Sequence, residues 1–223
     1  KLAALGQLSA GVAHEINNPL GTITIYAHLL LKNLEADDPR REDVMMIVNE
    51  AQRAKEIVQG LLSFARETKL RPGETDVNSV IEDVLGLVAN QSLFHNIVIR
   101  KSLACDLPTF FADATQLKQV FLNVFLNAVQ AMESGGRLTI EALPLESGKS
   151  FVRITDTGPG ISEETLEKVF DPFFTTKKGG TGLGLSICYT ILKAHGGEIE
   201  LRSRPGEGTT VLVSLPASPR SAS

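Results

Sequence analysis

The chain has 223 residues, of which 43% are hydrophobic and 22% are charged, as is typical of one large or two small globular domains rather than of a disordered protein. The formal net charge of −4 gives no general electrostatic reason to bind nucleic acid or an anionic membrane surface. Any phosphate ligand must therefore be held by a local site.

Targeting signals and cysteines predict where this part of the protein lies. We find no run of about 18 apolar residues that could cross a membrane, and we expect no signal peptide. Residue 1 is Lys rather than Met, so we suspect a fragment whose sensory or membrane part is missing. Cys105 and Cys188 lie in apolar runs without metal-type spacing, which predicts small buried side chains in a reducing compartment. We therefore expect this fragment to be cytoplasmic and to make no membrane contact, although the full-length protein can be membrane-anchored.

The first 70 residues are predicted to form two helices. Apolar residues recur in steps of three and four from Leu5 to Leu34, which indicates one face of a long helix. In the polar stretch that follows, Pro39 should end this helix and Asp43 should favour the start of the next. A heptad seam then runs from Val44 to Ala65. Two helices cannot cover their own apolar stripe, so we predict a homodimeric four-helix bundle.

A change of pattern follows the short predicted linker RPGE, residues 71–74. Beyond it, helices are predicted at residues 77–90, 113–132, 162–170 and 185–194, and strands at residues 96–104, 136–145, 150–156, 197–205 and 208–216. This alternation predicts an α+β fold, with a two-layer α/β sandwich. The tail, residues 218–223, carries no apolar pattern and is predicted to be disordered.

His14 and Glu15 form an ionisable pair inside the first predicted helix. At 100° per residue His14 projects roughly opposite the apolar stripe, and Asn18, one turn later, shares its exposed face. An ordinary surface histidine is the alternative, but a neutral imidazole beside a carboxylate can attack an electrophile. Pro19 has no N–H for the Glu15 carbonyl, at a cost of about 3 kcal/mol for an interior proline. We interpret it as a hinge at the candidate site, with a tolerated kink as the alternative.

The second half of the chain carries residues suited to a metal and a nucleotide. Asn123 and Asn127 lie at i and i+4 on the polar side of a helix, where their amide oxygens suit Mg²⁺ and its waters. Buried capping amides are the alternative. Asp156 ends a predicted strand, and a carboxylate there can accept a hydrogen bond from the exocyclic amine of adenine. On its own, Asp-x-Gly is an ordinary turn.

A glycine-rich run after Lys177 leads directly into a predicted helix. Exposed backbone N–H groups and the positive end of a helix suit a triphosphate, with a flexible linker as the alternative. The run lacks the G-x-x-x-x-G-K-[ST] pattern, which excludes a P-loop, and it does not follow a strand as a dinucleotide fingerprint does.

Taken in order, these segments closely resemble bacterial sensor histidine kinases over essentially all of the chain. HEINNPL resembles the phosphoacceptor box, NVFLNAVQAM the N box, DTGPG the first glycine box, FDPFFTTK the F box and GTGLGL the second glycine box. HEINNPL, LLSFAR and NAVQAM look most like the nitrogen-regulation branch of that family. The second half resembles the ATP-binding fold of DNA gyrase and mismatch-repair ATPases.

The resemblance implies an ATP-dependent protein histidine autokinase with ATP and Mg²⁺ as cofactors. It implies that His14 is phosphorylated, that Glu15 orients and deprotonates its ring, and that Asn18 positions ATP and a hydrolytic water. Asn127, helped by Asn123, would hold Mg²⁺, and Asp156 would bind adenine. The implied cofactor-binding residues are Asn123, Asn127, Asp156, Gly158, Gly160, Lys177, Thr181, Gly182, Leu183, Gly184 and Leu185.

A mobile lid over the nucleotide is also implied by the resemblance. Phe170, Phe173 and Phe174 would anchor this lid, and Lys177 would lie near the phosphates. Gln130 departs from the pattern, because many relatives carry a basic residue there, so phosphate charge would rest more on Mg²⁺ and Lys177.

The resemblance divides the chain into residues 1–70, a dimerisation and histidine phosphotransfer hairpin, residues 75–217, a catalytic ATP-binding domain, and the tail. It implies two partners, a second copy in a homodimer and a response regulator whose receiver-domain aspartate takes the phosphoryl group, and no nucleic acid. An additional phosphatase activity on that regulator is expected. Two alternatives stay open: a protein that is chiefly a phosphatase, and a non-enzymatic nucleotide-driven switch or scaffold, against which the His14–Glu15 pair argues.

Overall fold

The structure is a computed structural model. It describes the backbone of residues 2–65, 70–88, 94–105, 107, 109–144, 149–177 and 180–216. Among these residues, the side chains of 2–14, 56, 59–65 and 149–150 are not described. The chain divides into two compact units, each treated by itself below: unit 1 comprises residues 1–68 and 172–183, and unit 2 comprises residues 69–171 and 184–223.

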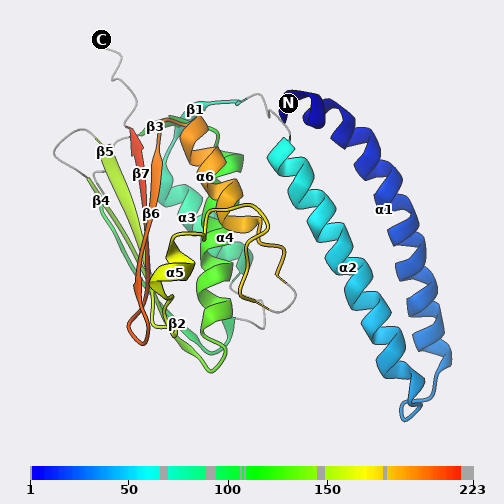
Figure 1. Ribbon diagram of the computed structural model, residues 1–223. Coiled ribbons are helices and arrows are strands. Elements are labelled where there is room, and N and C mark those ends of the chain that lie inside the picture. The colour runs from blue at the N-terminus through cyan, green and yellow to red at the C-terminus, as the bar shows by residue number, and fades with distance from the viewer. Residues whose placement is uncertain are drawn as a thin grey trace. The chain divides into compact units, whose positions relative to one another are not determined.

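Unit 1 contains a helical hairpin, as predicted, formed by α1 (Leu2–Asn33) and α2 (Arg40–Ala65). The two helices lie side by side along their length (Figure 1). Helix α1 continues through Pro19 without interruption. Whether Pro19 acts as a hinge stays a prediction. None of the described helices is long and apolar enough to cross a membrane.

The turn between the helices corrects one prediction. Helix α2 begins at Arg40 rather than near Asp43, because Asp38 Oδ1 accepts a hydrogen bond from the Arg40 backbone N–H at 2.9 Å. The Arg40 guanidinium also donates to this carboxylate, and these bonds lower the pKa of Asp38 to about 2. Arg41 donates to the carbonyl of Leu34 at 3.0 Å, satisfying an acceptor just beyond the end of α1.

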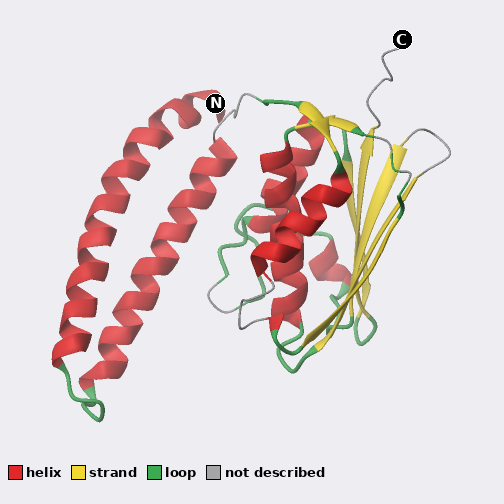
Figure 2. Cartoon of the chain, turned by 180° about the vertical axis from the view of Figure 1, so that it is seen from behind, coloured by secondary structure: helices red, strands yellow, loops and turns green. Residues whose placement is uncertain are grey.

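Unit 2 is the predicted two-layer sandwich. Its five-stranded sheet has the order β2-β4-β5-β7-β6, with β2 parallel to β4 and the other pairs antiparallel. Helices α3, α4 and α6 cover one face of this sheet (Figures 1 and 2). The elements are β1 (Gly73–Thr75), α3 (Val77–Val88), β2 (Ile97–Leu103), β3 (Phe110–Ala112), α4 (Ala114–Ala131), β4 (Gly136–Pro144), β5 (Lys149–Asp156), α5 (Glu163–Leu166), α6 (Gly184–Ala194), β6 (Glu198–Arg204) and β7 (Gly208–Pro216).

The core of unit 2 lies between this sheet and its helices. Alternate residues of the central strands are buried, as the two-residue period of a strand requires, and they meet the apolar face of α4. Full burial of each such side chain stabilises the fold by about 1.5–3 kcal/mol. The buried residues include Leu138, Ile140, Val152, Ile154 and Val213 of the sheet and Val120, Phe121, Val124 and Phe125 of α4.

Two features of unit 2 differ from the sequence predictions. Gly73 and Glu74, expected in the linker, belong to β1, which pairs antiparallel with the unpredicted strand β3. Cys105, predicted to be buried, is exposed, whereas Cys188 is buried as expected. The predicted tail, residues 218–223, lies outside the described residues.

Candidate functional site

The candidate phosphoacceptor segment lies within α1. His14 is helical, but its side chain lies outside the described part of the chain. Glu15 and Asn18 are both exposed. Residues three apart on a helix share a face, so a carboxylate and an amide stand together on the solvent side of this segment.

Asp156 is the last residue of β5 and is only 5% exposed. Its Oδ1 accepts hydrogen bonds from the backbone N–H groups of Gly158 at 2.9 Å and Thr209 at 3.2 Å. The pairing of β5 with β7 places Thr209 directly opposite Asp156. These bonds fix the orientation of a buried carboxylate, which would be costly to bury without such partners. Thr209 has no signal in the sequence, because its role depends on the register of two strands.

Three glycines, at Asp156 and at the neighbouring end of β6, stand where no side chain fits. A Cβ at Gly158 would lie 2.9 Å from Asp156 Oδ1. Gly160 has φ +74°, and a Cβ there would lie 2.0 Å from the carbonyl oxygen of Arg204. Gly208, which we did not predict, has φ +85°, and a Cβ there would lie 2.1 Å from the carbonyl oxygen of Asp156.

The two predicted amides lie beside the start of α6. Asn123 Nδ2 donates to the carbonyl of Gly184 at 3.2 Å. A Cβ on Gly184 would lie 3.8 Å from Asn127 Nδ2 and 3.9 Å from Asn123 Cγ. The structure therefore brings Asn123, Asn127 and Gly184 together, with the half-buried Leu185 one residue further on. Amide oxygens next to the positive end of a helix suit a hard cation together with phosphate.

The amide oxygens of Asn123 and Asn127 suit Mg²⁺ only when an anionic ligand, such as a phosphate, binds the metal as well. Asn123 and Asn127 are neutral, and the described residues contain no group of three or more His, Cys, Asp or Glu side chains that could hold a metal. Mg²⁺ usually keeps several waters and is bound through a few protein oxygens and the phosphates of its substrate. The amides suit that mode of binding.

The remaining predicted residues, Lys177, Thr181, Gly182 and Leu183, lie in a loop of unit 1. The backbone N–H of Phe173 donates to the carbonyl of Gly182 at 3.0 Å. This hydrogen bond joins the two ends of the loop. Gly182 has φ +67°, and a Cβ there would lie 2.4 Å from the carbonyl carbon of Phe173, so only glycine fits.

The predicted aromatic anchors of the loop behave differently from one another. In unit 2, the ring of Phe170 lies 5.8 Å from that of Tyr189 on α6, a partner that we did not predict. Phe173 is 55% exposed and has φ +69°, so its backbone rather than its ring holds the loop. Phe174 is half-buried.

Comparison with known proteins identifies both halves of the chain. Residues 4–69 match a family model described as "His Kinase A (phospho-acceptor) domain", and residues 112–219 match one described as "Histidine kinase-, DNA gyrase B-, and HSP90-like ATPase". The chain is 35% identical to the solved catalytic domain of histidine kinase ThkA, over 67% of this chain and 97% of that domain, with a TM-score of 0.61. The chain belongs to the sensor histidine kinase family.

Other sensor kinases match nearly the whole chain. It is 38% identical to sensor histidine kinase ZraS of Escherichia coli K12, over 97% of this chain and 46% of ZraS, and 36% identical to AtoS of the same strain, over 99% of this chain and 36% of AtoS. The chain thus spans less than half the length of these relatives.

Two solved structures cover both units. ThkA in complex with response regulator TrrA is 32% identical, over 99% of this chain and 64% of that chain, with a TM-score of 0.72. Full-length ShkA in complex with AMPPNP is 26% identical, over 95% of this chain and 46% of that chain, with a TM-score of 0.77. The predicted fold, a helical hairpin and an ATPase-type sandwich, is confirmed.

The two cysteines of this histidine kinase should differ sharply in reactivity. Burial raises the pKa of the Cys188 thiol to about 12, although a hydrogen bond with Asn123 opposes the shift. We expect iodoacetamide at mildly alkaline pH to alkylate Cys105 and spare Cys188, as measured by mass spectrometry of tryptic peptides. In denaturant both should react, and equal labelling in the folded protein would contradict the buried position of Cys188.

Proposed function

We propose that this chain is an ATP-dependent protein histidine autokinase that phosphorylates His14. One observation carries the proposal: a phosphoacceptor-type hairpin containing the His14–Glu15 pair is followed, in the same chain, by an ATPase fold in which Asp156 is held by two backbone N–H groups. The structure of ShkA with AMPPNP supports an adenine nucleotide as the ligand. The solvent-facing side chain of Glu15 supports an acceptor accessible to a second domain.

In the proposed reaction, Nε2 of His14 attacks the γ-phosphorus of ATP. A P–N bond forms as the bond from the γ-phosphorus to the bridging oxygen breaks, and ADP leaves with the electron pair. Glu15 orients the ring and takes up the proton from its other nitrogen. Asn18 helps to place ATP before transfer.

The nucleotide is proposed to lie in unit 2. Asp156 accepts the hydrogen bond from the adenine amine, and Mg²⁺, held by Asn127 with the help of Asn123, would neutralise charge on the phosphates. Lys177 would lie near the phosphates, and with Gln130 in place of a basic residue it would carry more of that charge. The glycines Gly158, Gly160, Gly182 and Gly184, together with Thr181, Leu183 and Leu185, would shape the lid and its base.

The proposed partners are a second copy of the chain and a response regulator. The complex of ThkA with TrrA supports an aspartate of such a regulator as the next phosphoryl acceptor. Exposed Asn18, one turn beyond His14, favours an additional phosphatase activity, in which this amide would position the attacking water. The segments HEINNPL, LLSFAR and NAVQAM support placement in the nitrogen-regulation branch.

The proposed domains are residues 1–70 for dimerisation and phosphotransfer and residues 75–217 for catalysis. The pairing of Gly73 and Glu74 with β3 supports including these two residues in the catalytic domain.

The test is incubation of the chain with γ-labelled ATP and Mg²⁺. We expect protein-bound label that is labile in acid and stable in alkali, as a phosphorus–nitrogen bond requires. His14→Gln should abolish the label, whereas His28→Gln, which changes an exposed histidine on the same helix, should retain it. Absence of label in the unmodified chain would refute the autokinase and favour a phosphatase or a non-enzymatic switch.

A further inference from the structure

A cluster of hydrogen bonds at Asp113 joins three parts of unit 2 away from the residues assigned to phosphoryl transfer. Asp113 is the N-cap of α4, where its Oδ1 accepts from the backbone N–H groups of Thr115 at 3.0 Å and Gln116 at 3.2 Å. The residue is only 8% exposed. A buried carboxylate at a helix N-terminus is stabilised by these bonds and by the helix dipole.

The second oxygen of Asp113 holds the chain where it enters unit 2. Oδ2 accepts from the backbone N–H of Arg71 at 3.1 Å. Two residues later β1 begins, with Gly73 paired to Ala112. The buried hydroxyl of Thr75 donates to the carbonyl of Ala112 at 2.8 Å. The entering segment is therefore fixed to the residues that immediately precede α4.

His195 connects the same point to α6. The backbone N–H of Asp113 donates to His195 Nε2 at 2.9 Å, and Nδ1 of the ring lies 2.8 Å from the carbonyl oxygen of Ile191. A backbone N–H can only donate and a carbonyl can only accept. The arrangement therefore requires a neutral imidazole with its proton on Nδ1. His195 directly follows α6, so the end of α6 is tied to the start of α4.

These bonds make α4 and α6 a pair of helices joined at two points. One is the Asp113–His195 bond, and the other is the bond from Asn123 to Gly184. At 1.5 Å per residue, the segments from Asp113 to Asn123 and from Gly184 to His195 span about 15 Å and about 16 Å. The near-equal spans let both bonds form between antiparallel helices without bending either one. The chain entry and the amide cluster are thus connected through α4 and α6, which are bonded to each other at these two points.

We propose that Asp113 and His195 are positioning residues for phosphoryl transfer to His14. They hold the chain entry at Arg71 in a fixed relation to Asn123 and Asn127. This inference rests on the proposed autokinase, in which one continuous chain connects the acceptor helix α1 to the nucleotide-bearing unit that it enters at Arg71. A fixed entry at Arg71 limits the orientations in which the γ-phosphoryl group can approach His14, and in-line transfer depends on orientation.

Arg71 offers a matched pair of variants. Arg71→Pro removes the backbone N–H that donates to Asp113, whereas Arg71→Ala removes the side chain and keeps that N–H. Asp113→Asn should keep the cap of α4, since asparagine caps helices as well as aspartate does, but it replaces an oxygen with an NH₂ group that cannot accept from Arg71. Circular dichroism and thermal melting of the full chain would verify that each variant is folded.

The measurement is the initial rate of His14 labelling as a function of ATP concentration, together with the Kd of an ATP analogue. We expect Arg71→Pro and Asp113→Asn to lower kcat about fivefold to tenfold while KM and the analogue Kd stay within about twofold. Arg71→Ala should behave as the unmodified chain. The double variant should be no slower than either single variant, because both changes break one bond.

Three outcomes would overturn the inference. Unchanged kcat in both variants, in a chain that does label His14, would refute the positioning role and leave the autokinase intact. A rise in the analogue Kd equal to the fall in kcat would show that Asp113 supports the nucleotide site instead. Absence of label in the unmodified chain would refute the autokinase and this inference with it.

Discussion

Replacing Asp156 with asparagine is expected to weaken ATP binding about 10-fold to 100-fold while leaving unit 2 folded. The asparagine oxygen can still accept the N–H groups of Gly158 and Thr209 that Oδ1 accepts now. The other oxygen becomes an NH₂ donor, which would face the donating amine of adenine. The variant loses a charge-assisted hydrogen bond to adenine, and its NH₂ group faces the adenine amine, which is also a donor. Together these two effects account for a loss of about 10-fold to 100-fold in ATP affinity.

Calorimetric titration with ATP and GTP would measure this effect. The variant should lose affinity for ATP and gain in its ratio of GTP to ATP binding, because an amide NH₂ can donate to the guanine carbonyl oxygen. Glu141→Gln is a suitable control, since it makes the same carboxylate-to-amide change at a half-buried position paired with Arg153 on the same sheet. Equal ATP affinity in the Asp156→Asn variant and the unmodified chain would refute the assignment of Asp156 to adenine.

Elements with a strong repeating pattern could be predicted from the sequence. Helix α4 shows why: its apolar side is encoded within the helix itself, and the predicted bounds, residues 113–132, exceed the observed ones by one residue at each end. The start of α2 was missed because Asp38 and Asp43 are both plausible capping residues, and only the hydrogen bonds of Asp38 with Arg40 decide between them. Strands β1 and β3 have three residues each, too few to display a two-residue period.

Residues whose roles depend on contacts distant in sequence could not be predicted. Thr209 meets Asp156 only through the register of β5 and β7, and Gly208 is required by the same close approach. Tyr189 supports Phe170 from α6 across a separation that no local pattern encodes. Cys105 follows an apolar run, yet it is exposed, because it lies beyond the end of β2.

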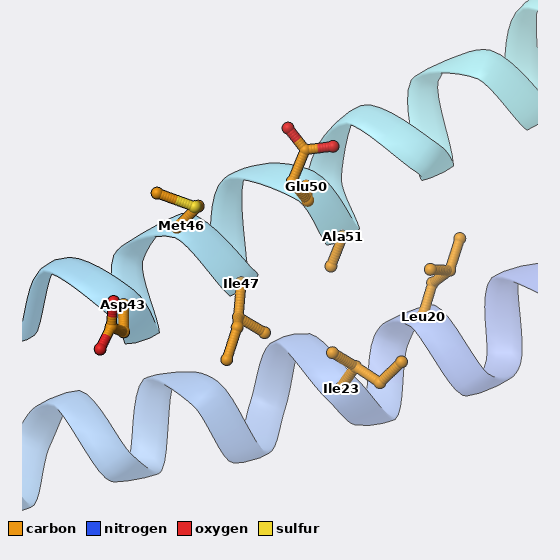
Figure 3. Close-up of a pocket in the computed structure, with 7 residues that line it drawn as sticks. All are labelled: Leu20, Ile23, Asp43, Met46, Ile47, Glu50 and Ala51. Carbon is orange, nitrogen blue, oxygen red and sulfur yellow. The ribbon is translucent and has the colours of Figure 1, made fainter. Parts of the chain in front are cut away.

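The hairpin of unit 1 leaves apolar side chains uncovered in a single chain. Ala27 and Ala51 are buried between the helices, but Ile23 and Ile47 remain 45% and 48% exposed. Figure 3 shows Ile23 and Ile47 beside an apolar hollow between α1 and α2, with Asp43 and Glu50 among the residues that line it. Exposed isoleucines along the line where the two helices of a hairpin meet are expected if a second hairpin packs against that line.

Replacing Ile23 with glutamate is therefore expected to dissociate the proposed homodimer. Ile23 is 45% exposed in the single chain, so burying the rest of this side chain in both copies contributes about 1.5–3 kcal/mol, and its loss corresponds to a rise of about 10-fold to 100-fold in the dimer Kd. The new carboxylates would add repulsion beside Asp43 and Glu50. Analytical ultracentrifugation over a range of protein concentrations would measure the change.

Ile25→Glu supplies the matched control for the dimer. Ile25 is 62% exposed and lies two residues after Ile23 on the same helix, so it projects about 200° away. Because the chemical change and the helix are identical, a difference between the two variants reports the face of α1 rather than helix propensity or net charge. Dissociation by Ile23→Glu alone would place the interface on the face of α1 that carries Ile23 rather than on the face that carries the exposed Ile25. Equal behaviour of the two variants would show that a different surface joins the copies.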